Sequence, residues 1–92
     1  MQFMPKLKEH LKSNGVIYTV RGYDMTHKWV LVEGVGWCER FPLGVIKNLD
    51  DIKDFVPNSG FETLSDWISA IRIYIKEGNP AWLYKVEVRE YE

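Results

Sequence analysis

Residues 63–89 read TLSDWISAIRIYIKEGNPAWLYKVEVR and carry the two clearest periodic patterns of the chain. The first pattern is helical, because apolar side chains recur every three or four residues, at Leu64, Trp67, Ile68, Ile71, Tyr74 and Ile75. Thr63 suits a helix cap with Asp66 three residues further on, and residues 77–80 (Glu-Gly-Asn-Pro) contain the common helix-ending residues. We therefore predict an amphipathic helix that begins at Thr63 and ends before Pro80.

The second pattern is the alternation of a strand over residues 81–89. The two faces of this strand would carry Trp82, Tyr84, Val86 and Val88 on one side and Leu83, Lys85, Glu87 and Arg89 on the other. The alternation indicates one buried face and one face in water.

Earlier stretches also have strand character. Residues 16–23 are rich in β-branched and aromatic side chains and predict a strand, with Val16, Tyr18 and Val20 opposite Ile17, Thr19, Arg21 and Tyr23. Residues 24–27 predict a turn, and residues 28–35 predict a second strand. Gly34 and Gly36 mark a bend or bulge before a third strand at residues 37–41. We expect Pro42 to break that strand and residues 43–47 to continue as a short fourth.

Two further segments complete the chain. Residues 5–13 predict a short helix, because Pro5 suits the first helical turn and Leu7 and Leu11 share one face. Asn14 and Gly15 would end this helix. Residues 48–55 predict either a helical turn or a loop, which ends at residues 57–60.

The order helix, strands, helix, strand indicates the α+β class. We expect a single domain over residues 1–92, with a mostly antiparallel, curled β-sheet or small β-barrel and two or three short helices. A chain of 92 residues buries only about 60–65% of the surface that its unfolded form exposes, so the core is thin.

Composition excludes several classes of protein. Hydrophobic residues make up 46% of the chain, which is too apolar for a disordered segment. The formal net charge is −1, which argues against a protein that binds polyanions by bulk charge. No apolar run approaches a membrane span, and the first six residues do not resemble a signal peptide. One cysteine without a disulfide partner fits a reducing compartment, so we expect a cytoplasmic protein.

The sequence predicts no catalytic constellation, metal site or cofactor. Gly34-Val35-Gly36 lacks the rest of a phosphate-binding loop, and no Gly-x-Ser-x-Gly motif is present. Cys38 is expected to be a small core residue, since nothing marks a third group that would orient a Cys38–His27 pair, and zinc would find only His10 besides these two. Asp50, Asp51 and Asp54 are expected to be solvated.

Charge is distributed unevenly along the chain. Residues 1–47 hold seven basic and four acidic side chains, whereas residues 48–92 hold five basic and nine acidic ones. We therefore look for an anion-binding surface in the first half, where basic and aromatic residues lie on neighbouring predicted strands: Arg21, Tyr23, His27, Lys28, Trp29, Trp37 and Arg40. Cations hold phosphates and aromatic faces stack on unpaired bases, so this set suits RNA.

The aromatic members of this set have a competing interpretation as core. We expect Trp29 to be buried, with Leu31 and Val35 on its face, and Trp67 to be buried in the helix stripe. Trp37 and Tyr23 are left open between core and solvent.

Three stretches together resemble the ASCH domain, a small relative of the PUA RNA-binding fold. They are residues 11–23 (LKSNGVIYTVRGY), residues 42–46 (PLGVI), and residues 59–71 (SGFETLSDWISAI) followed by 82–88 (WLYKVEV). The resemblance implies a PUA-like β-barrel with helices packed around it, and a cleft near the first helix and strand that accepts RNA or a nucleotide. It also implies that Thr19 and Arg21 line this cleft.

The chain departs from the family pattern in places that bear on catalysis. Many members carry Gly-x-Lys-x-x-Glu-x-Arg, whereas here Ile17 and Val20 stand in place of the Lys and Glu, and Arg21 comes one residue early. Some members hydrolyse acetylcytidine with Lys, Thr and Glu. Only Thr19 matches, and Glu33 or Glu39 would have to supply the proton carrier.

The leading hypothesis is an RNA-binding module, and the sequence favours binding over catalysis without deciding between them. Phosphates would contact Lys12, Arg21, Lys28 and Arg40, bases would stack on Tyr23 and Trp37, and Thr19 would line the cleft. One alternative is a small hydrolase of a modified nucleoside. Another is an interaction protein without a nucleic-acid role, in which the strand at residues 81–91 meets a protein partner or a second copy.

Overall fold

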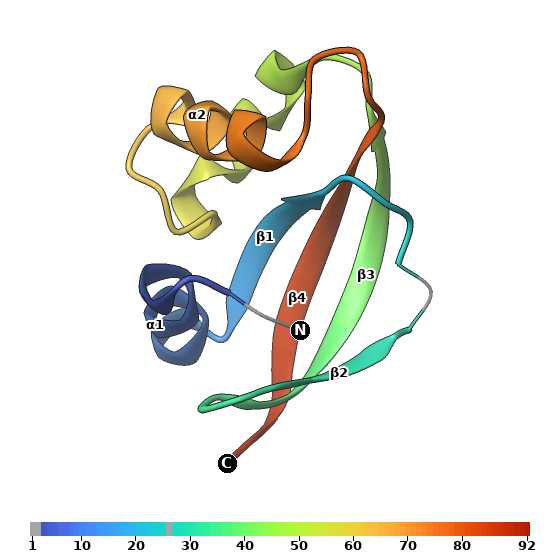
Figure 1. Cartoon of the computed structure of the whole chain (residues 1–92). Coiled ribbons are helices and arrows are strands. Elements are labelled where there is room, and N and C mark those ends of the chain that lie inside the picture. Colours follow the sequence, from blue (N-terminus) through green and yellow to red (C-terminus); the bar gives the residue numbers. More distant parts are fainter. Residues whose placement is uncertain (1–2, 26) are drawn as a thin grey trace.

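The computed structural model describes residues 3–25 and 27–92, and it shows a curled antiparallel sheet with three helices (Figure 1). The elements follow in the order α1 (Pro5–Asn14), β1 (Val16–Arg21), β2 (Trp29–Val32), β3 (Gly36–Ile46), the 3₁₀ helix η1 (Leu49–Asn58), α2 (Leu64–Tyr74) and β4 (Ala81–Tyr91). The strand order is β1-β4-β3-β2, so β4 is central although it comes last in the chain. Among the described residues, β1 and β2 are the two edges of this sheet.

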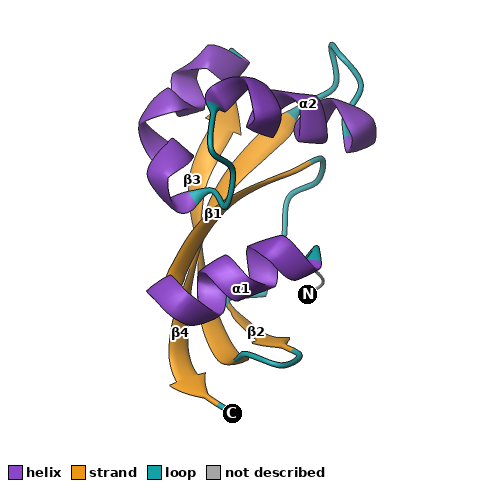
Figure 2. Ribbon diagram, turned by 90° about the vertical axis from the view of Figure 1, so that its left-hand side faces the viewer, coloured by secondary structure: helices purple, strands orange, loops and turns teal. Residues whose placement is uncertain are grey.

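Helix α1 lies on one side of the sheet and η1 on the other, while α2 lies across one end of the strands (Figure 2). We call the face that carries Ile17, Cys38 and Val86 the α1 face, because these side chains pack on Leu11 of α1. The opposite face carries Leu83, which packs under η1 and α2 with Ile52, Trp67 and Ile71 as part of a second core. The molecule therefore has two small cores that share the central strand β4.

The predicted start and end of α1 and the predicted cap of α2 are confirmed. Pro5 begins α1, and the N–H of Gly15, in the left-handed conformation (φ 76°), donates to the Leu11 carbonyl oxygen at 2.8 Å. Thr63 caps α2, since its hydroxyl oxygen accepts from the Asp66 N–H at 3.1 Å. Helix α2 ends at Tyr74, a few residues before the predicted Gly-Asn-Pro stop.

The strands differ from the prediction mainly around Pro42. Strand β3 runs unbroken through Pro42, which keeps Tyr84 of β4 as its register partner. The register shifts just after it, between Pro42 and Gly44, so that Leu43 is the extra residue of a β-bulge next to the proline. The prediction that Pro42 ends the strand is therefore wrong. Strand β1 stops at Arg21, β2 covers only Trp29–Val32, and β4 continues to Tyr91.

The segment that follows β1 crosses in front of β4 and β3 to reach the far edge of the sheet at β2 (Figure 1). The predicted turn at residues 24–27 falls on this segment, but Thr26, like Met1 and Gln2, lies outside the described residues.

Several burial predictions need correction. Trp29 and Leu31 were expected in the core, yet they are 53% and 47% exposed, because no helix covers their part of the sheet (Figure 1). Leu83 shares the predicted strand face of Lys85, Glu87 and Arg89, yet it is buried, since η1 and α2 cover its end of the strand. Tyr74 is exposed at the last residue of α2, whereas Trp67 and Cys38 are buried as predicted.

The α+β class, the antiparallel curled sheet and the three helices agree with the prediction. None of the described helices has the length and apolar character needed to cross a membrane.

Gly36 provides a test of how closely β3 and β4 approach. A Cβ at Gly36 would lie 2.1 Å from the Glu90 carbonyl oxygen, whereas a Cβ at Gly44 would meet nothing within 4 Å. Both residues have a similar positive φ (133° and 126°), so both alanine variants carry backbone strain of about 1–2 kcal/mol. We expect Gly36→Ala to lower the free energy of unfolding by at least about 2 kcal/mol more than Gly44→Ala. Urea denaturation measures the difference, and equal losses would contradict the contact.

Candidate nucleic-acid interface

A cavity of about 370 Å³ opens beside the edge strand β1, between the N-terminal end of α1 and helix α2. Its wall is largely apolar and aromatic, and it is lined by Phe3, Met4, Leu7, Thr19, Val20, Arg21, Phe61, Trp67, Ala70, Ile71 and Tyr74. Its volume falls in the range of about 300–1,000 Å³ that is usual for small-molecule and cofactor sites.

Arg21 is the charged residue among the described residues that line this cavity. It is the last residue of β1, and alternation along the strand places it on the same face as Thr19, which is 7% exposed. The Arg21 guanidinium carbon lies 5.2 Å from the centre of the Phe3 ring. Burial lowers the pKa of Arg21 from its ordinary value, although the group remains charged at neutral pH.

Two tyrosines lie close enough to Arg21 to interact with it electrostatically. Tyr23 follows β1 and Tyr74 ends α2, and their exposed fractions are 60% and 76%. Tyr23 is near Arg21 in the sequence, whereas Tyr74 reaches it only through the fold.

Phe61 and Trp67 form the opposite aromatic wall. Their rings are stacked, with centres 6.5 Å apart and an angle of 15° between the planes. The Lys6 ammonium lies 5.6 Å from the centre of the Phe61 ring, which adds a second cation beside the cavity. The sequence prediction did not include Lys6, Phe61 or Tyr74. The sequence feature that could have pointed to Phe61 is the glycine before it. A Cβ on Gly60 would lie 2.4 Å from the Leu7 side chain, so a glycine at this position allows α1 to pack closely beside Phe61.

Tyr84 fixes the segment that carries Tyr23. Its buried hydroxyl oxygen accepts from the Met25 N–H at 2.6 Å and lies 3.2 Å from Asp24 Oδ1 and 3.3 Å from the Tyr23 carbonyl oxygen. Burial raises the pKa of Tyr84, and the hydrogen bond to Asp24 adds to this although the Met25 N–H opposes it. The phenol thus stays protonated at neutral pH and can donate.

Arg40 and Lys12 are placed apart from the cavity wall. Arg40 is 4% exposed, its guanidinium donates to the His27 carbonyl oxygen, and its carbon lies 5.7 Å from the centre of the Tyr84 ring. It supports the crossing segment from inside. Lys12 lies in the exposed last turn of α1, and its carbonyl oxygen accepts from the Tyr91 hydroxyl at 3.2 Å.

Lys28 and Trp37 belong to the opposite side of the molecule. The Lys28 ammonium contacts Glu39 at 3.0 Å, and Trp37 lies next to the α1-face residue Cys38 and so points to the other face. Thr19 and Arg21 therefore share one cavity, while Lys28 and Trp37 do not reach it.

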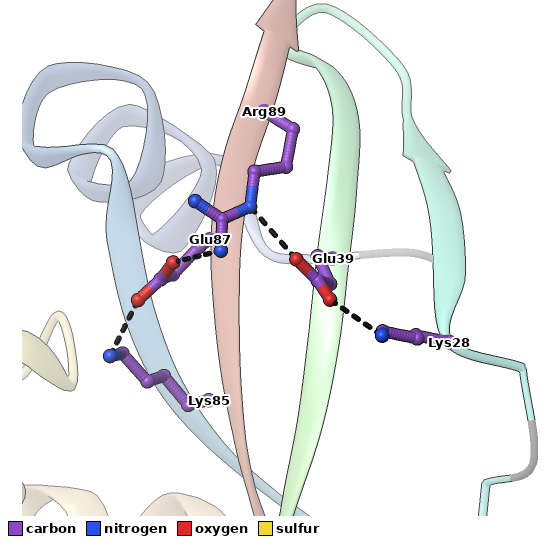
Figure 3. Close-up of polar contacts among 5 residues, drawn as sticks. All are labelled: Lys28, Glu39, Lys85, Glu87 and Arg89. Atoms are coloured by element: carbon purple, nitrogen blue, oxygen red, sulfur yellow. Dashed lines mark hydrogen bonds and ion pairs between the residues drawn. The ribbon is translucent and has the colours of Figure 1, made fainter.

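Lys28, the residue before β2, starts a ladder of ion pairs that continues over β3 and β4 (Figure 3). Glu39 also contacts Arg89 at 2.9 Å, Arg89 contacts Glu87 at 2.8 Å, and Glu87 contacts Lys85 at 2.5 Å. The hydrogen bond from Lys28, reinforced by the one from Arg89, holds the pKa of Glu39 below its usual value although burial acts the other way.

The described lining residues of the cavity include no carboxylate, imidazole or thiol, and Glu39 lies on the opposite face in the ion-pair ladder. Burial raises the pKa of the Cys38 thiol, which makes it a poor nucleophile at neutral pH. Within residues 3–25 and 27–92, no group of three or more His, Cys, Asp or Glu side chains is placed to hold a metal ion.

No family model matches the chain, and comparisons with curated proteins and with solved structures find no similar protein. The resemblance to the ASCH domain therefore stays a sequence-based expectation.

Replacing Tyr84 with phenylalanine tests the anchor of the crossing segment. Tyr84→Phe removes the acceptor of the Met25 N–H, and we expect a loss of about 1–3 kcal/mol in the free energy of unfolding. Tyr91→Phe is the matched control, because its hydroxyl bond to Lys12 is exposed and its loss should cost less than about 1 kcal/mol. Thermal or urea unfolding compares the two variants, and similar losses would show that Tyr84 does not anchor the segment.

Proposed function

We propose that this protein is an RNA-binding module that holds an unpaired nucleotide in the cavity between α1, β1 and α2. The observation that carries the proposal is the Arg21 guanidinium in the wall of an otherwise apolar, aromatic cavity. Thr19 adds a hydroxyl to the same wall.

A phosphate is the natural partner of Arg21 in this setting. The guanidinium is charged and lies in a largely apolar wall, where a charge-assisted hydrogen bond to an anion is stronger than in open water. Guanidinium and phosphate also match in geometry, since two N–H groups can donate to two phosphate oxygens. Lys6, next to Phe61 at the same cavity, adds to the positive potential there.

The aromatic wall suits the base. An unpaired base has two flat faces, and stacking on an aromatic side chain contributes about 1–3 kcal/mol per base. Phe61 lines the cavity, and Tyr23 and Tyr74 near Arg21 offer exposed rings for neighbouring bases. The base of a paired duplex keeps its faces and edges occupied, so this arrangement favours single strands, loops and ends.

Affinity must come from this local site, because the whole chain carries a net charge of −1. We therefore expect modest binding that weakens as salt is added.

Arg21→Gln is the direct test, measured by fluorescence anisotropy of a short labelled single-stranded RNA at several salt concentrations. We expect wild-type binding to be saturable, and the variant to bind about tenfold more weakly with a salt slope lower by about one. A fully paired RNA duplex should bind at least about tenfold more weakly than the single strand.

The matched control is Arg72→Gln, which removes the same charge from an exposed position on α2 that is not in the cavity wall. Its affinity should stay within about twofold of wild type. Salt-insensitive binding, or equal losses in the two variants, would refute the proposal.

A further inference from the structure

A second surface lies on the hairpin formed by β2 and β3, away from the cavity. Trp29, Leu31 and Trp37 point to the face opposite α1, where Leu31 is the register partner of Trp37 and Trp29 is the partner of Glu39. Their exposed fractions are 53%, 47% and 48%. We call these three residues the tryptophan patch.

The tryptophan patch is a contiguous apolar area rather than a scatter of single exposed side chains. Helices η1 and α2 cover the other end of this face, where Leu83 is buried, and leave the hairpin open (Figure 2). Contiguous exposed apolar area on a small protein marks an interaction surface. The two indoles are also the residue type most often found at the energetic centre of protein interfaces.

The charged side chains around the tryptophan patch indicate the charge of the partner that would bind there. Glu33 lies in the turn between β2 and β3, Glu90 is the register partner of Trp37, and the Glu92 N–H donates to the Val35 carbonyl oxygen. All three side chains are exposed, and they form no ion pair with any residue that the structure describes. The cations on this face, Lys28, Lys85 and Arg89, are already paired within the ladder (Figure 3).

We propose that the tryptophan patch docks an extended segment of a partner protein in which arginine side chains flank an apolar residue. The apolar residue would contact Leu31, and the guanidinium groups would lie on the exposed indole faces and pair with the carboxylates at the hairpin end. RNA does not fit this surface, because its phosphates would meet Glu33, Glu90 and Glu92. The proposal is independent of the Arg21 cavity.

The test uses a synthetic peptide in which arginine, valine and arginine alternate with serine, so that all three contact residues share one face when the peptide is extended. The readout is the set of indole N–H resonances of the intact protein. We expect saturable shifts for Trp29 and Trp37, and none for Trp67, which is 3% exposed. Replacing arginine with glutamate in the peptide should abolish the shifts.

Two variants separate the contribution of the indole from that of the carboxylates to peptide binding. Trp37→Thr places a β-branched residue with high strand propensity at this position, and we expect it to weaken peptide binding about tenfold while the amide spectrum shows a folded protein. The triple variant Glu33→Gln/Glu90→Gln/Glu92→Gln should weaken binding about fivefold. Asp54→Asn/Glu62→Gln/Glu77→Gln removes the same charge from exposed positions elsewhere and should bind normally.

Four results would overturn the proposal. They are the absence of Trp29 and Trp37 shifts at saturating peptide, equal shifts with the glutamate peptide, shifts that depend on protein concentration without peptide, and shifts produced by RNA. The third result would assign the tryptophan patch to a second copy of the chain, and the fourth to nucleic acid.

Discussion

The rest of the structure depends on one constraint: the central strand β4 contributes side chains to two separate cores. This strand pairs with β1 and β3 at once, and its neighbouring residues point into different cores: Leu83 packs under η1 and α2, and Val86 packs under α1. A small chain that divides its apolar residues between two cores must place helices on both sides of one sheet. The edge strand β1 then runs between α1 and α2, and the cavity with Arg21 forms where the three elements meet.

The same constraint separates two surfaces of different character. Beside β1, cations and aromatic rings surround a cavity, whereas on the β2–β3 hairpin exposed indoles lie among carboxylates. Basic and aromatic residues that are neighbours in sequence, such as Arg21 and Lys28, end on opposite sides of the sheet because the chain crosses from one edge to the other between them. This separation lets the two proposals be tested one at a time.

Local patterns in the sequence predicted the elements well, because caps and periodicity act over a few residues. Thr63, Gly15 and the shared face of Thr19 and Arg21 follow from such spacing. The exposure of Trp29 could not be predicted in this way. Alternation along a strand shows which face of the sheet a residue lies on, but it does not show whether a helix covers that face. The composition of the cavity wall also could not be predicted from the sequence, since Phe61 and Tyr74 approach Arg21 only through tertiary packing.

The central claim is that the cavity beside β1 receives an unpaired RNA nucleotide. An amide NMR titration with a short single-stranded RNA at low salt tests it most directly. We expect saturable shifts that cluster on the cavity wall, at Thr19, Arg21, Phe61 and Tyr74, with the tryptophan patch unchanged. Shifts that are absent, that never saturate, or that map to the β2–β3 hairpin would contradict it.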